Sequence, residues 1–373
     1  MSDLEVEWIS SWDLFAALAP EWDALADTAD AESIFLRHGW FRSAWQWVSK
    51  DASLAILCVR KQRRLVGILP LLDEQHRMRW IRVRRLRSFD VPDTQQFSLI
   101  CAATDARDVA AAIGRQLRLT AGARDWLQLR KLYTTPANSA LINELKKLRR
   151  CTWEAADTCP CVMLQDTWER YYSRRSRRLK KGNNLIANRL AKAFPSIKVT
   201  KTVLDESPAG DVALAELLAL CSESWKKDMD TSLHQPGPRA WVEELRRALS
   251  GRVVLWGLRL DDELAAAELQ LEQSGVVSAL RADAREKYES FGTGTYLGWK
   301  LLETIMNTGK SLYNMGPGLS EYKARWAEHD VQLAVGNCYS ATTRGLILWL
   351  FDRYVRPLRK NIGKIARAPT AET

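Results

Sequence analysis

Runs of hydrophobic residues bounded by polar turns predict two β-hairpins that lie far apart in the chain. Residues 53–60 (SLAILCVR) and 64–72 (RLVGILPLL) are separated by a short polar turn. Residues 252–260 (RVVLWGLRL) and 263–272 (ELAAAELQLE) are separated by Asp261-Asp262. Short apolar runs joined by polar turn residues are typical of antiparallel strand pairs.

The two hairpins follow one pattern, which predicts an internal duplication. An offset of 199 residues aligns Arg60 with Arg259, Leu65 with Leu264 and Gly67 with Ala266. Each hairpin is followed by a further strand-like run, at 96–101 and 276–284, and then by a helical segment, at about 105–121 and 294–309. The repeated order predicts a duplicated unit of the mixed α+β class.

Further helices are predicted between and after the two units. Residues 167–194 have the composition of a helix or helix pair that is interrupted near Gly182-Asn183-Asn184. Residues 209–228 carry a core-facing stripe at helical spacing, made of Leu214, Leu217, Leu218, Cys221 and Trp225. Residues 346–365 mix an apolar head with basic residues, which is typical of a basic amphipathic helix.

Length and composition agree with a two-domain globular protein. The 373 residues exceed the size at which one core usually keeps growing, and 46% of them are hydrophobic. The first residues are acidic rather than basic, and no apolar run reaches the roughly 18 residues that a membrane span needs. We therefore expect a cytoplasmic protein.

The seven cysteines and four histidines do not predict a metal site. The cysteines are scattered and most lie in apolar runs, and the spacing of Cys159-Pro-Cys161 matches neither a zinc site nor a redox motif. We expect the cysteines to be buried as free thiols, because free cysteine behaves as a small hydrophobic residue.

The net charge of +10 comes from three basic clusters on an otherwise acidic chain. Residues 77–87 hold six arginines, 170–192 hold nine Lys and Arg, and 344–367 hold seven against Asp352. The second cluster has three interpretations: a solvated helix face, a site for a polyanion such as a CoA phosphate, or an RNA contact. Because no aromatic residues are interleaved with its charges, sequence-specific nucleic-acid binding is not predicted.

The segment 276–326 carries the clearest chemical signals. A predicted strand delivers Arg281 and Asp283, and a loop leads to Gly292-Thr293-Gly294-Thr295 at the start of an apolar helix. Glycines let backbone amides approach a ligand, and the free N–H groups of a helix start bind phosphate. A tight turn explains the same glycines equally well. A second strand, 311–315, leads to Gly316-Pro317-Gly318 and then to Tyr322-Lys323.

The order of these features resembles the GNAT acyltransferase superfamily, and within it the double-domain, CelD/BcsL-like branch associated with bacterial cellulose and exopolysaccharide formation. The resemblance covers about residues 8–345. In the N-terminal part it rests on Phe35, Trp40, Trp45, residues 66–71 (VGILPL) and Asp93, followed by the basic segment 174–178. In the C-terminal part it rests on Asp283, Tyr288, Gly292, Gly316, Tyr322, Lys323 and Trp326.

This resemblance implies two GNAT folds in tandem, similar to the Fem-type aminoacyl transferases, each with a mixed, mostly antiparallel sheet flanked by helices. The implied domains are 1–155, 156–343 with the donor site, and a C-terminal helix and tail, 344–373. The implied reaction is acyl transfer from acetyl-CoA or another acyl-CoA to an amine or hydroxyl of a small-molecule or glycan acceptor, without a metal. The chain departs from the family's pyrophosphate loop in having Glu289 where Arg or Gln is usual.

The absence of a Ser-His-Asp or Cys-His signature favours direct transfer over a covalent intermediate. Our hypothesis assigns Asp283 as general base or acceptor-orienting carboxylate, Tyr322 as the acid that protonates the leaving thiolate, and Lys323 as a contact to a phosphate or the oxyanion. The structural alternatives are a carboxylate that caps the following loop, a packed tyrosine and a solvated lysine. By the same hypothesis, the donor is held by Arg281, Phe291, Gly292, Thr293, Gly294 and Thr295. The acceptor is contacted by Trp40, Asp93, Tyr288 and Gly316. For the clustered tryptophans Trp40, Trp45 and Trp47, however, helical spacing favours core packing over a sugar-binding groove.

Two other functions remain open. The first is a Fem-like transferase that uses aminoacyl-tRNA as its donor. The second is a non-catalytic scaffold of polysaccharide assembly, held peripherally at an anionic membrane through residues 344–367. The alternative for that segment is a terminal helix packed on its own domain.

Overall fold

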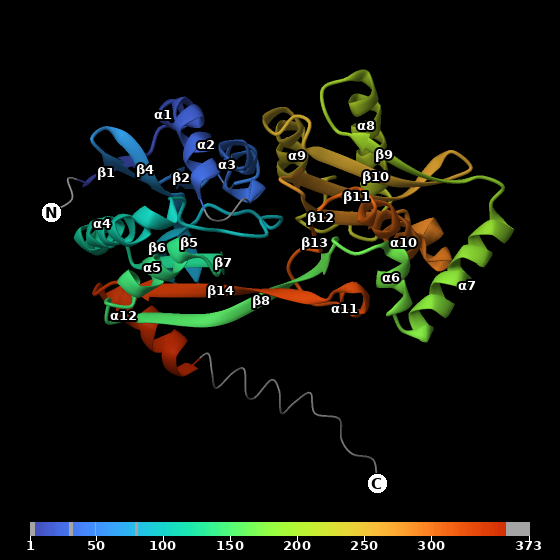
Figure 1. The fold of residues 1–373 in the computed structure, drawn as a ribbon. Helices are drawn as coiled ribbons and strands as arrows, with labels where there is room; N and C mark the ends of the chain where they lie inside the picture. The colour runs from blue at the N-terminus through green and yellow to red at the C-terminus, as the bar shows by residue number, and fades with distance from the viewer. Residues whose placement is uncertain (1–3, 30–32, 49, 79–80, 356–373) are drawn as a thin grey trace, which may run out of the picture.

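The computed structural model describes residues 4–29, 33–48, 50–78 and 81–355 of the chain. Its architecture is a mixed α+β fold in which one large sheet runs through two halves that sit side by side (Figure 1). The N-terminal half contains helices α1 (Trp12–Ala17), α2 (Ala19–Thr28), α3 (His38–Trp45), α4 (Ala106–Leu119) and α5 (Pro136–Leu145). The C-terminal half contains α6 (Trp168–Ser173), α7 (Arg177–Ala193), α8 (Pro208–Ser222), α9 (Pro236–Ala248), α10 (Thr293–Met306) and α11 (Glu321–Trp326).

The strands form an eleven-stranded sheet and a three-stranded sheet. The large sheet has the order β2 (Ala52–Leu54), β5 (Leu71–Met78), β6 (Ile81–Ser88), β7 (Trp126–Tyr133), β14 (His329–Tyr339), β8 (Cys151–Met163), β13 (Leu312–Asn314), β12 (Val276–Ala284), β11 (Glu263–Gln273), β10 (Val253–Leu260) and β9 (Ile197–Val203). The small sheet has the order β1 (Leu4–Ile9), β3 (Ile56–Lys61) and β4 (Arg64–Leu69). Only the pairs β6–β7 and β12–β13 are parallel within these sheets.

The predicted duplication is confirmed by two hairpins with the same backbone irregularities. The β3–β4 turn places Gln62 and Arg63 at φ of 49° and 67°, and the β10–β11 turn places Asp261 and Asp262 at 47° and 68°. Such left-handed pairs make the tight turns that suit the twist of a hairpin. Both hairpins also shift register one residue before the aligned arginines, between Val59 and Arg60 and between Leu258 and Arg259.

Long strands join the two halves. The strands β8 and β14 pair with each other, and each also pairs with one half: β14 with β7, and β8 with β13. In Figure 1 these two strands run along the lower side of both halves. The predicted domain boundary at 155/156 falls inside β8.

Three hydrophobic clusters account for most of the core. One lies on the α4–α5 face of the N-terminal half, and one lies between α10 and the C-terminal sheet. The third joins the halves, because α1–α3 and the α8–α9 face of the C-terminal sheet contribute to the same cluster. Its fully buried aromatic residues include Trp22, Trp40, Phe41 and Trp241.

Several expected elements differ from the structure. The expected strand 96–101 makes only two isolated bridges, because the Asn138 side chain takes the Leu99 N–H and the Phe97 carbonyl that a neighbouring strand would use. The run 64–72 is two strands, β4 and β5, in different sheets. The expected break near Gly182 is wrong, since the chain breaks before α7, where Ser176 caps the Leu179 N–H.

Two helices also end differently from the expectation. Helix α8 ends at Ser222, so Trp225 lies in the following loop and is 60% exposed instead of facing the core. Within the expected C-terminal helix 346–365, the structure describes the end of α12 (Thr343–Leu350) and a π-helical turn (Phe351–Val355). Residues 356–365 of that prediction lie outside the described residues.

The cysteine expectation is wrong for one pair. Cys151 and Cys338 face each other in the β8–β14 pair and form a disulfide. The other five cysteines are free and buried, as expected. No helix among the described residues is long and apolar enough to cross a membrane.

Most of the described arginines of the basic cluster 77–87 form local ion pairs. It lies on the β5–β6 pair, where Arg84 binds Asp73, Arg85 and Arg87 bind Glu74, and Arg87 also reaches Asp90. Arg79 and Trp80 lie outside the described residues. The cluster therefore stabilises the edge of the sheet and leaves little free charge there.

Gly67 provides a test of the packing between β4 and α4. A Cβ atom at this position would overlap Val109 Cγ1 of α4. We expect Gly67→Ala to lower the free energy of unfolding by about 1–3 kcal/mol through overpacking. The added Val109→Ala should recover part of this loss, so that the double variant costs about 1 kcal/mol less than the sum of the single changes. Chemical denaturation measures all three variants.

Gly182→Ala is the matched control, because nothing lies within 4 Å of a Cβ atom at Gly182 in the middle of α7. The gain in helix propensity should stabilise this variant by about 0.5–1 kcal/mol. Strict additivity of the Gly67→Ala and Val109→Ala costs would contradict the proposed contact.

Candidate active site

The strand β12 brings the predicted Arg281 and Asp283 to the seam between the two halves. In the β11–β12 ladder, Leu269 pairs with Arg281 and Gln270 with Ala279, so Leu280 is a bulged residue. Arg281 and Asp283 lie on the face of the sheet that α8 and α9 cover. A bulge re-aims the side chains beside it, which is why bulges are common near active sites.

The Asp283 carboxylate is held by the loop after α8. Its Oδ1 accepts a hydrogen bond from Ser224 Oγ at 3.2 Å and lies 3.4 Å from Lys226 Nζ. Lys226 Nζ also donates to the Ala282 carbonyl at 2.5 Å. Only 7% of the Asp283 side chain is exposed. The carboxylate is therefore fixed in orientation at the edge of the seam.

The N-terminal half contributes Asp93 and Gln95 to the same place. Asp93 Oδ2 lies 3.5 Å from Arg281 Nε, and Gln95 Nε2 donates to the Ala279 carbonyl on β12. Burial raises the pKa of Asp93, and the Arg281 charge opposes this shift. The rings of Trp47 and Trp241 each lie 6.0 Å from the Arg281 guanidinium. The structure thus brings three predicted residues together: Arg281, Asp283 and Asp93.

Several buried polar atoms at this seam have no hydrogen-bond partner. Among the described residues, Gln95 Oε1 and Arg281 Nη1 have no hydrogen-bond partner, and Asp93 Oδ2 and Arg281 Nε make no hydrogen bond but face each other in the ion pair at 3.5 Å. Each unsatisfied buried group costs about 1–3 kcal/mol. A concentration of such atoms in one place indicates that a polar ligand completes their hydrogen bonding.

The start of α10 is suited to an anion. Gly292 adopts a left-handed conformation (φ 74°) and no side chain caps the helix, so the first N–H groups at Thr293–Thr295 remain open. A cavity of about 460 Å³ adjoins Thr295 and is lined by Arg178 and Leu179 of α7 and by Glu321 and Arg325 of α11, which pair with each other. The open N–H groups at the helix start, together with Arg178, which forms no ion pair among the described residues, fit a pyrophosphate.

The basic helix α7 packs directly on this loop. Ile186 would be 3.1 Å from a Cβ atom at Gly292, and Arg189 Nη1 donates to the Ser290 carbonyl at 2.5 Å. Phe291 packs edge-on against Phe194, which follows α7. Glu289, which stands where the pyrophosphate loop of the family usually has Arg or Gln, is exposed, so its carboxylate is free to turn toward solvent.

Tyr322 and Lys323 lie on the α10 face of the sheet. A Cβ atom at Gly298 of α10 would overlap Tyr322 Oη, so this glycine makes room for the hydroxyl. Burial raises the pKa of Tyr322. Lys323 Nζ donates to the carbonyls of Gly316 and Pro317, each at 3.0 Å, and so holds the 316–318 loop. Gly316 itself needs its positive φ of 77° and lies against Gln95 and the Ala279 carbonyl.

Two predicted residues lie elsewhere. Trp40 is 0% exposed and packs edge-on against Phe35 and Trp241 in the core between the halves. Tyr288 donates to Glu263 Oε2 at 2.5 Å. Neither side chain joins the cluster around Arg281 and Asp283.

Sequence reasoning missed Glu268 and Gln95. Glu268 Oε1 accepts hydrogen bonds from Tyr313 Oη and Gln270 Nε2, both at 2.7 Å, close to Tyr322. Burial raises the pKa of Glu268. The alternation of charged and small residues along 263–272 placed Glu268 in a strand, but no feature of the sequence indicates its burial. Gln95 sits in an irregular segment whose position depends on the second half. Among the described residues no group of His, Cys, Asp and Glu is arranged to hold a metal.

Residues 184–324 match the family model described as the acetyltransferase (GNAT) domain. This part of the chain, which is less than half of it, is similar to a GNAT domain and runs from the middle of α7 to α11, including β12 and the start of α10. Comparison with curated protein sequences finds no match.

Solved structures share the tandem fold at low sequence identity. The structure titled FemX is 10% identical, with a TM-score of 0.55, over 88% of this chain and 96% of that one. A tandem GNAT protein from the clavulanic acid biosynthesis pathway is 12% identical, with a TM-score of 0.52, over 91% and 100%. A conserved protein of unknown function from Bacteroides thetaiotaomicron is 12% identical, with a TM-score of 0.54, over 90% and 100%. These likenesses establish a fold that resembles tandem GNAT proteins.

Glu268 yields a prediction about pH and stability. Its pKa is raised in the folded protein, so the folded state holds the proton more tightly than the unfolded chain. Stability from this group is present below the ordinary glutamate pKa, near about 4.3, and is lost as pH rises through the folded pKa. Glu268→Gln mimics the protonated acid, so its Tm relative to the unsubstituted protein should be higher at pH 8 than at pH 5.

Scanning calorimetry at the two pH values measures this difference. Glu303→Gln is the control, because Glu303 is only partly buried and pairs with Lys300 on one helix. A Tm difference for Glu268→Gln that is the same at both pH values would contradict the assignment.

Proposed function

We propose that the protein is an acyl-CoA-dependent N- or O-acyltransferase that passes the acyl group directly to a polar acceptor at the seam between its halves. The observation that carries the proposal is the pair of buried atoms without a hydrogen bond, Gln95 Oε1 and Arg281 Nη1, beside the Asp93–Arg281 ion pair. These residues lie on or beside β12, which also carries Asp283. The chain then continues to the GNAT-type helix start at Gly292. Acceptor and donor regions therefore share one strand.

On the donor side, the available groups fit acetyl-CoA or another acyl-CoA. The N–H groups at Thr293–Thr295 would bind the pyrophosphate, and Arg178 would lie beside it in the cavity next to α10, where Arg325 is already paired with Glu321. Phe291 fixes this loop against the end of α7. A pyrophosphate contact from α7 corresponds to the second interpretation of the basic cluster 170–192, which is a site for a polyanion. Acyl-CoA supplies the thioester, and the chain supplies orientation and proton transfer.

In the reaction, the acceptor amine or hydroxyl attacks the thioester carbon while Asp283 takes its proton. The carbon–sulfur bond breaks, and the leaving thiolate takes a proton from Tyr322. Because Asp283 and Tyr322 lie on opposite faces of the sheet, this role requires the thioester to lie in the gap between β12 and the segment after β13, which pair only through Val276–Ser278 and Leu312–Asn314. The raised pKa of Tyr322 keeps its phenol protonated, as a proton donor requires. Lys323 acts here by positioning, since its ammonium group holds the carbonyls of Gly316 and Pro317.

For the acceptor we propose a sugar or polysaccharide precursor, in line with the resemblance to the CelD/BcsL-like branch. Trp47 supports this class, because it is only partly buried and borders Arg281 at the seam. Indole faces suit sugar rings, and a guanidinium and two carboxylates suit their hydroxyl groups. A cytoplasmic location, with peripheral contact to an anionic membrane through 344–367, completes the proposal.

Replacing the two proton-transfer groups should abolish turnover and leave donor binding intact. We expect Asp283→Asn and Tyr322→Phe each to lower kcat by about 10²- to 10⁴-fold. Thiol release from acetyl-CoA in the presence of amino sugars and sugars measures turnover, and calorimetry measures acetyl-CoA binding. Arg178→Gln should instead weaken acetyl-CoA binding.

Asp262→Asn is the control for this experiment, because Asp262 lies in the exposed β10–β11 turn and pairs only with Lys198 among the described side chains. It should change neither measurement. Unchanged rates in both Asp283→Asn and Tyr322→Phe would reject their roles. Failure of the unsubstituted protein to bind acetyl-CoA would favour the non-catalytic scaffold or the donor considered next.

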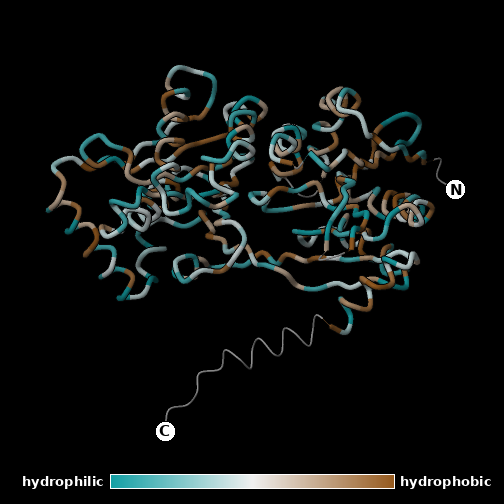
Figure 2. Tube along the Cα trace, turned by 180° about the vertical axis from the view of Figure 1, so that it is seen from behind, coloured by the Kyte–Doolittle hydropathy of each residue, from teal (hydrophilic) through white to brown (hydrophobic). Residues whose placement is uncertain are grey.

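A second candidate donor is aminoacyl-tRNA, as in the Fem-type transferases. It is favoured by the exposed basic residues of α7: Arg177, Arg178, Lys181 and Lys192. None of them forms an ion pair within the part of the chain that the structure describes. In Figure 2 the helix at the outer edge of the C-terminal half alternates hydrophilic and hydrophobic positions along its length.

This candidate predicts salt-dependent tRNA binding through α7. Filter binding should then show an affinity that falls steeply with salt, and Arg177→Gln/Lys181→Gln/Lys192→Gln should flatten that slope. No retention of tRNA at low salt would remove the candidate and leave acyl-CoA as the donor.

A further inference from the structure

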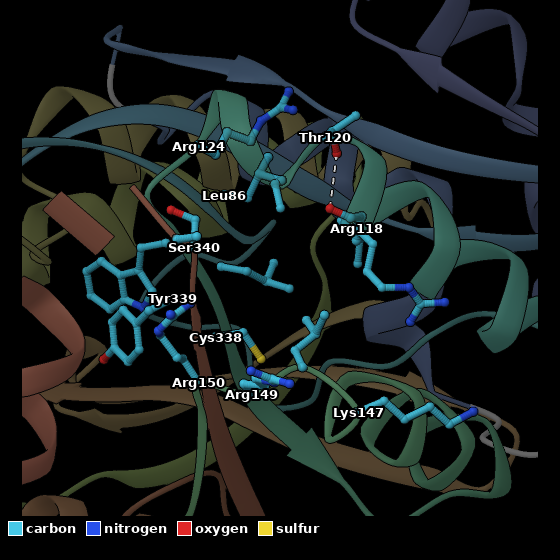
Figure 3. A pocket seen from close by; sticks show the side chains of 16 residues that line it. Leu86, Arg118, Thr120, Arg124, Lys147, Arg149, Arg150, Cys338, Tyr339 and Ser340 are labelled. Atoms are coloured by element: carbon cyan, nitrogen blue, oxygen red, sulfur yellow. Dashed lines mark hydrogen bonds between the residues drawn. The ribbon is translucent and has the colours of Figure 1, made fainter. Parts of the chain in front are cut away.

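A second candidate ligand site lies in the N-terminal half, apart from β12 and α10. It is a cavity of about 350 Å³ between the C-terminal end of α4, the loop 146–150 after α5, the start of β7 and residues 338–341. Figure 3 shows it from close by. The volume is near the lower end of the range of about 300–1,000 Å³ for small-molecule sites.

The interior of the cavity is apolar. Its walls include Leu86 of β6, Leu117 of α4, Trp126 and Leu127 of β7, and Leu148. Leu117 and Leu127 are buried members of the N-terminal core cluster, so the walls are rigid parts of the fold. Binding an alkyl chain against apolar walls of this kind is favourable, because it removes apolar surface from water.

The rim of the cavity is strongly basic. Five of its lining residues are cationic, namely Arg118, Arg124, Lys147, Arg149 and Arg150, and no lining residue is acidic. Figure 3 shows these side chains distributed around the hollow, with Arg124 on one side and Arg149 and Arg150 on the opposite side.

Three of these charges are not neutralised within the fold. Arg124 pairs with Asp73, and Lys147 pairs with Glu144. Arg118, Arg149 and Arg150 form no ion pair among residues 4–29, 33–48, 50–78 and 81–355. The C-terminal end of α4 does not itself attract an anion, because the C-terminus of a helix carries the negative end of the helix dipole. The arginines therefore supply the attraction.

One other assignment of the cavity is excluded by position. A duplicated donor site would lie at the N-terminal start of α4, by analogy with α10. The cavity lies at the other end of this 14-residue helix, about 20 Å away.

We propose that this cavity binds a single-chain lipid with an anionic head group. The alkyl chain lies against Leu86, Leu117 and Leu148, and a phosphate or carboxylate head contacts Arg118, Arg149 and Arg150. The volume suits one chain better than two. This inference does not depend on the proposed acyl transfer.

Calorimetry on the full chain with dodecyl phosphate, below the concentration at which it forms micelles, tests the proposal. We expect saturable binding with one site per chain. Inorganic phosphate has no chain and dodecyl maltoside has no charge, so both should bind at least about tenfold more weakly. Dodecanoate distinguishes the head groups: binding equal to that of dodecyl phosphate indicates a general anion site.

Variants locate the site. Arg118→Gln/Arg149→Gln should weaken dodecyl phosphate binding by about tenfold or more. Arg107→Gln/Arg115→Gln is the matched control, since both arginines are exposed on α4 outside the cavity lining and the same charge is removed. Ala341→Trp, at an exposed position of the lining, should block the cavity without lowering Tm.

Three results would overturn the proposal. Equal weakening by the two arginine pairs would mean a diffuse electrostatic attraction. Dodecyl maltoside binding as tightly as dodecyl phosphate would mean an apolar surface without head-group recognition. Displacement of dodecyl phosphate by acetyl-CoA would place it at α10, and this outcome leaves the proposed acyl transfer untouched.

Discussion

The pairing of β8 with β14 is the constraint on which the rest of the structure depends. These strands come from the middle and the end of the described chain, and each also pairs with a different half. They make the two GNAT-like units one continuous sheet. The relative position of the halves is therefore set by backbone hydrogen bonds as well as by the shared aromatic core around Trp40 and Trp241. A seam fixed in this way can hold Asp93 against Arg281 across two units.

The fold was predictable from the sequence where the signals were local. The hairpins at 53–72 and 252–272 follow from apolar runs and turn residues, and their alignment extends to the φ values of the turns. The β8–β14 pair was not predictable, because the paired residues are more than 150 positions apart in the chain. Neither sequence contains a feature that identifies the other as its partner strand. The Cys151–Cys338 disulfide was missed for the same reason, since it depends on that register.

The candidate site was predictable only in part. Arg281 and Asp283 follow from the strand and loop pattern, and Asp93 from the family resemblance. Gln95 and Glu268 could not be found, because a neutral amide and a strand carboxylate look ordinary until burial is known. The 96–101 segment shows why burial decides: Asn138 replaces a strand as its hydrogen-bond partner, and this leaves the neighbouring Gln95 free to reach Ala279.

The distribution of charge changes most between sequence and structure. The arginines of 77–87 are one of the three basic clusters predicted from the sequence, yet Asp73, Glu74 and Asp90 neutralise most of those described. The cavity rim combines three cations of the short basic run 146–150 with Arg118 of α4 and Arg124. The three clusters predicted from the sequence include the first group and omit the second. Free positive charge is a property of the folded surface, since it depends on which cations lack a carboxylate nearby, and that is decided by contacts between distant segments.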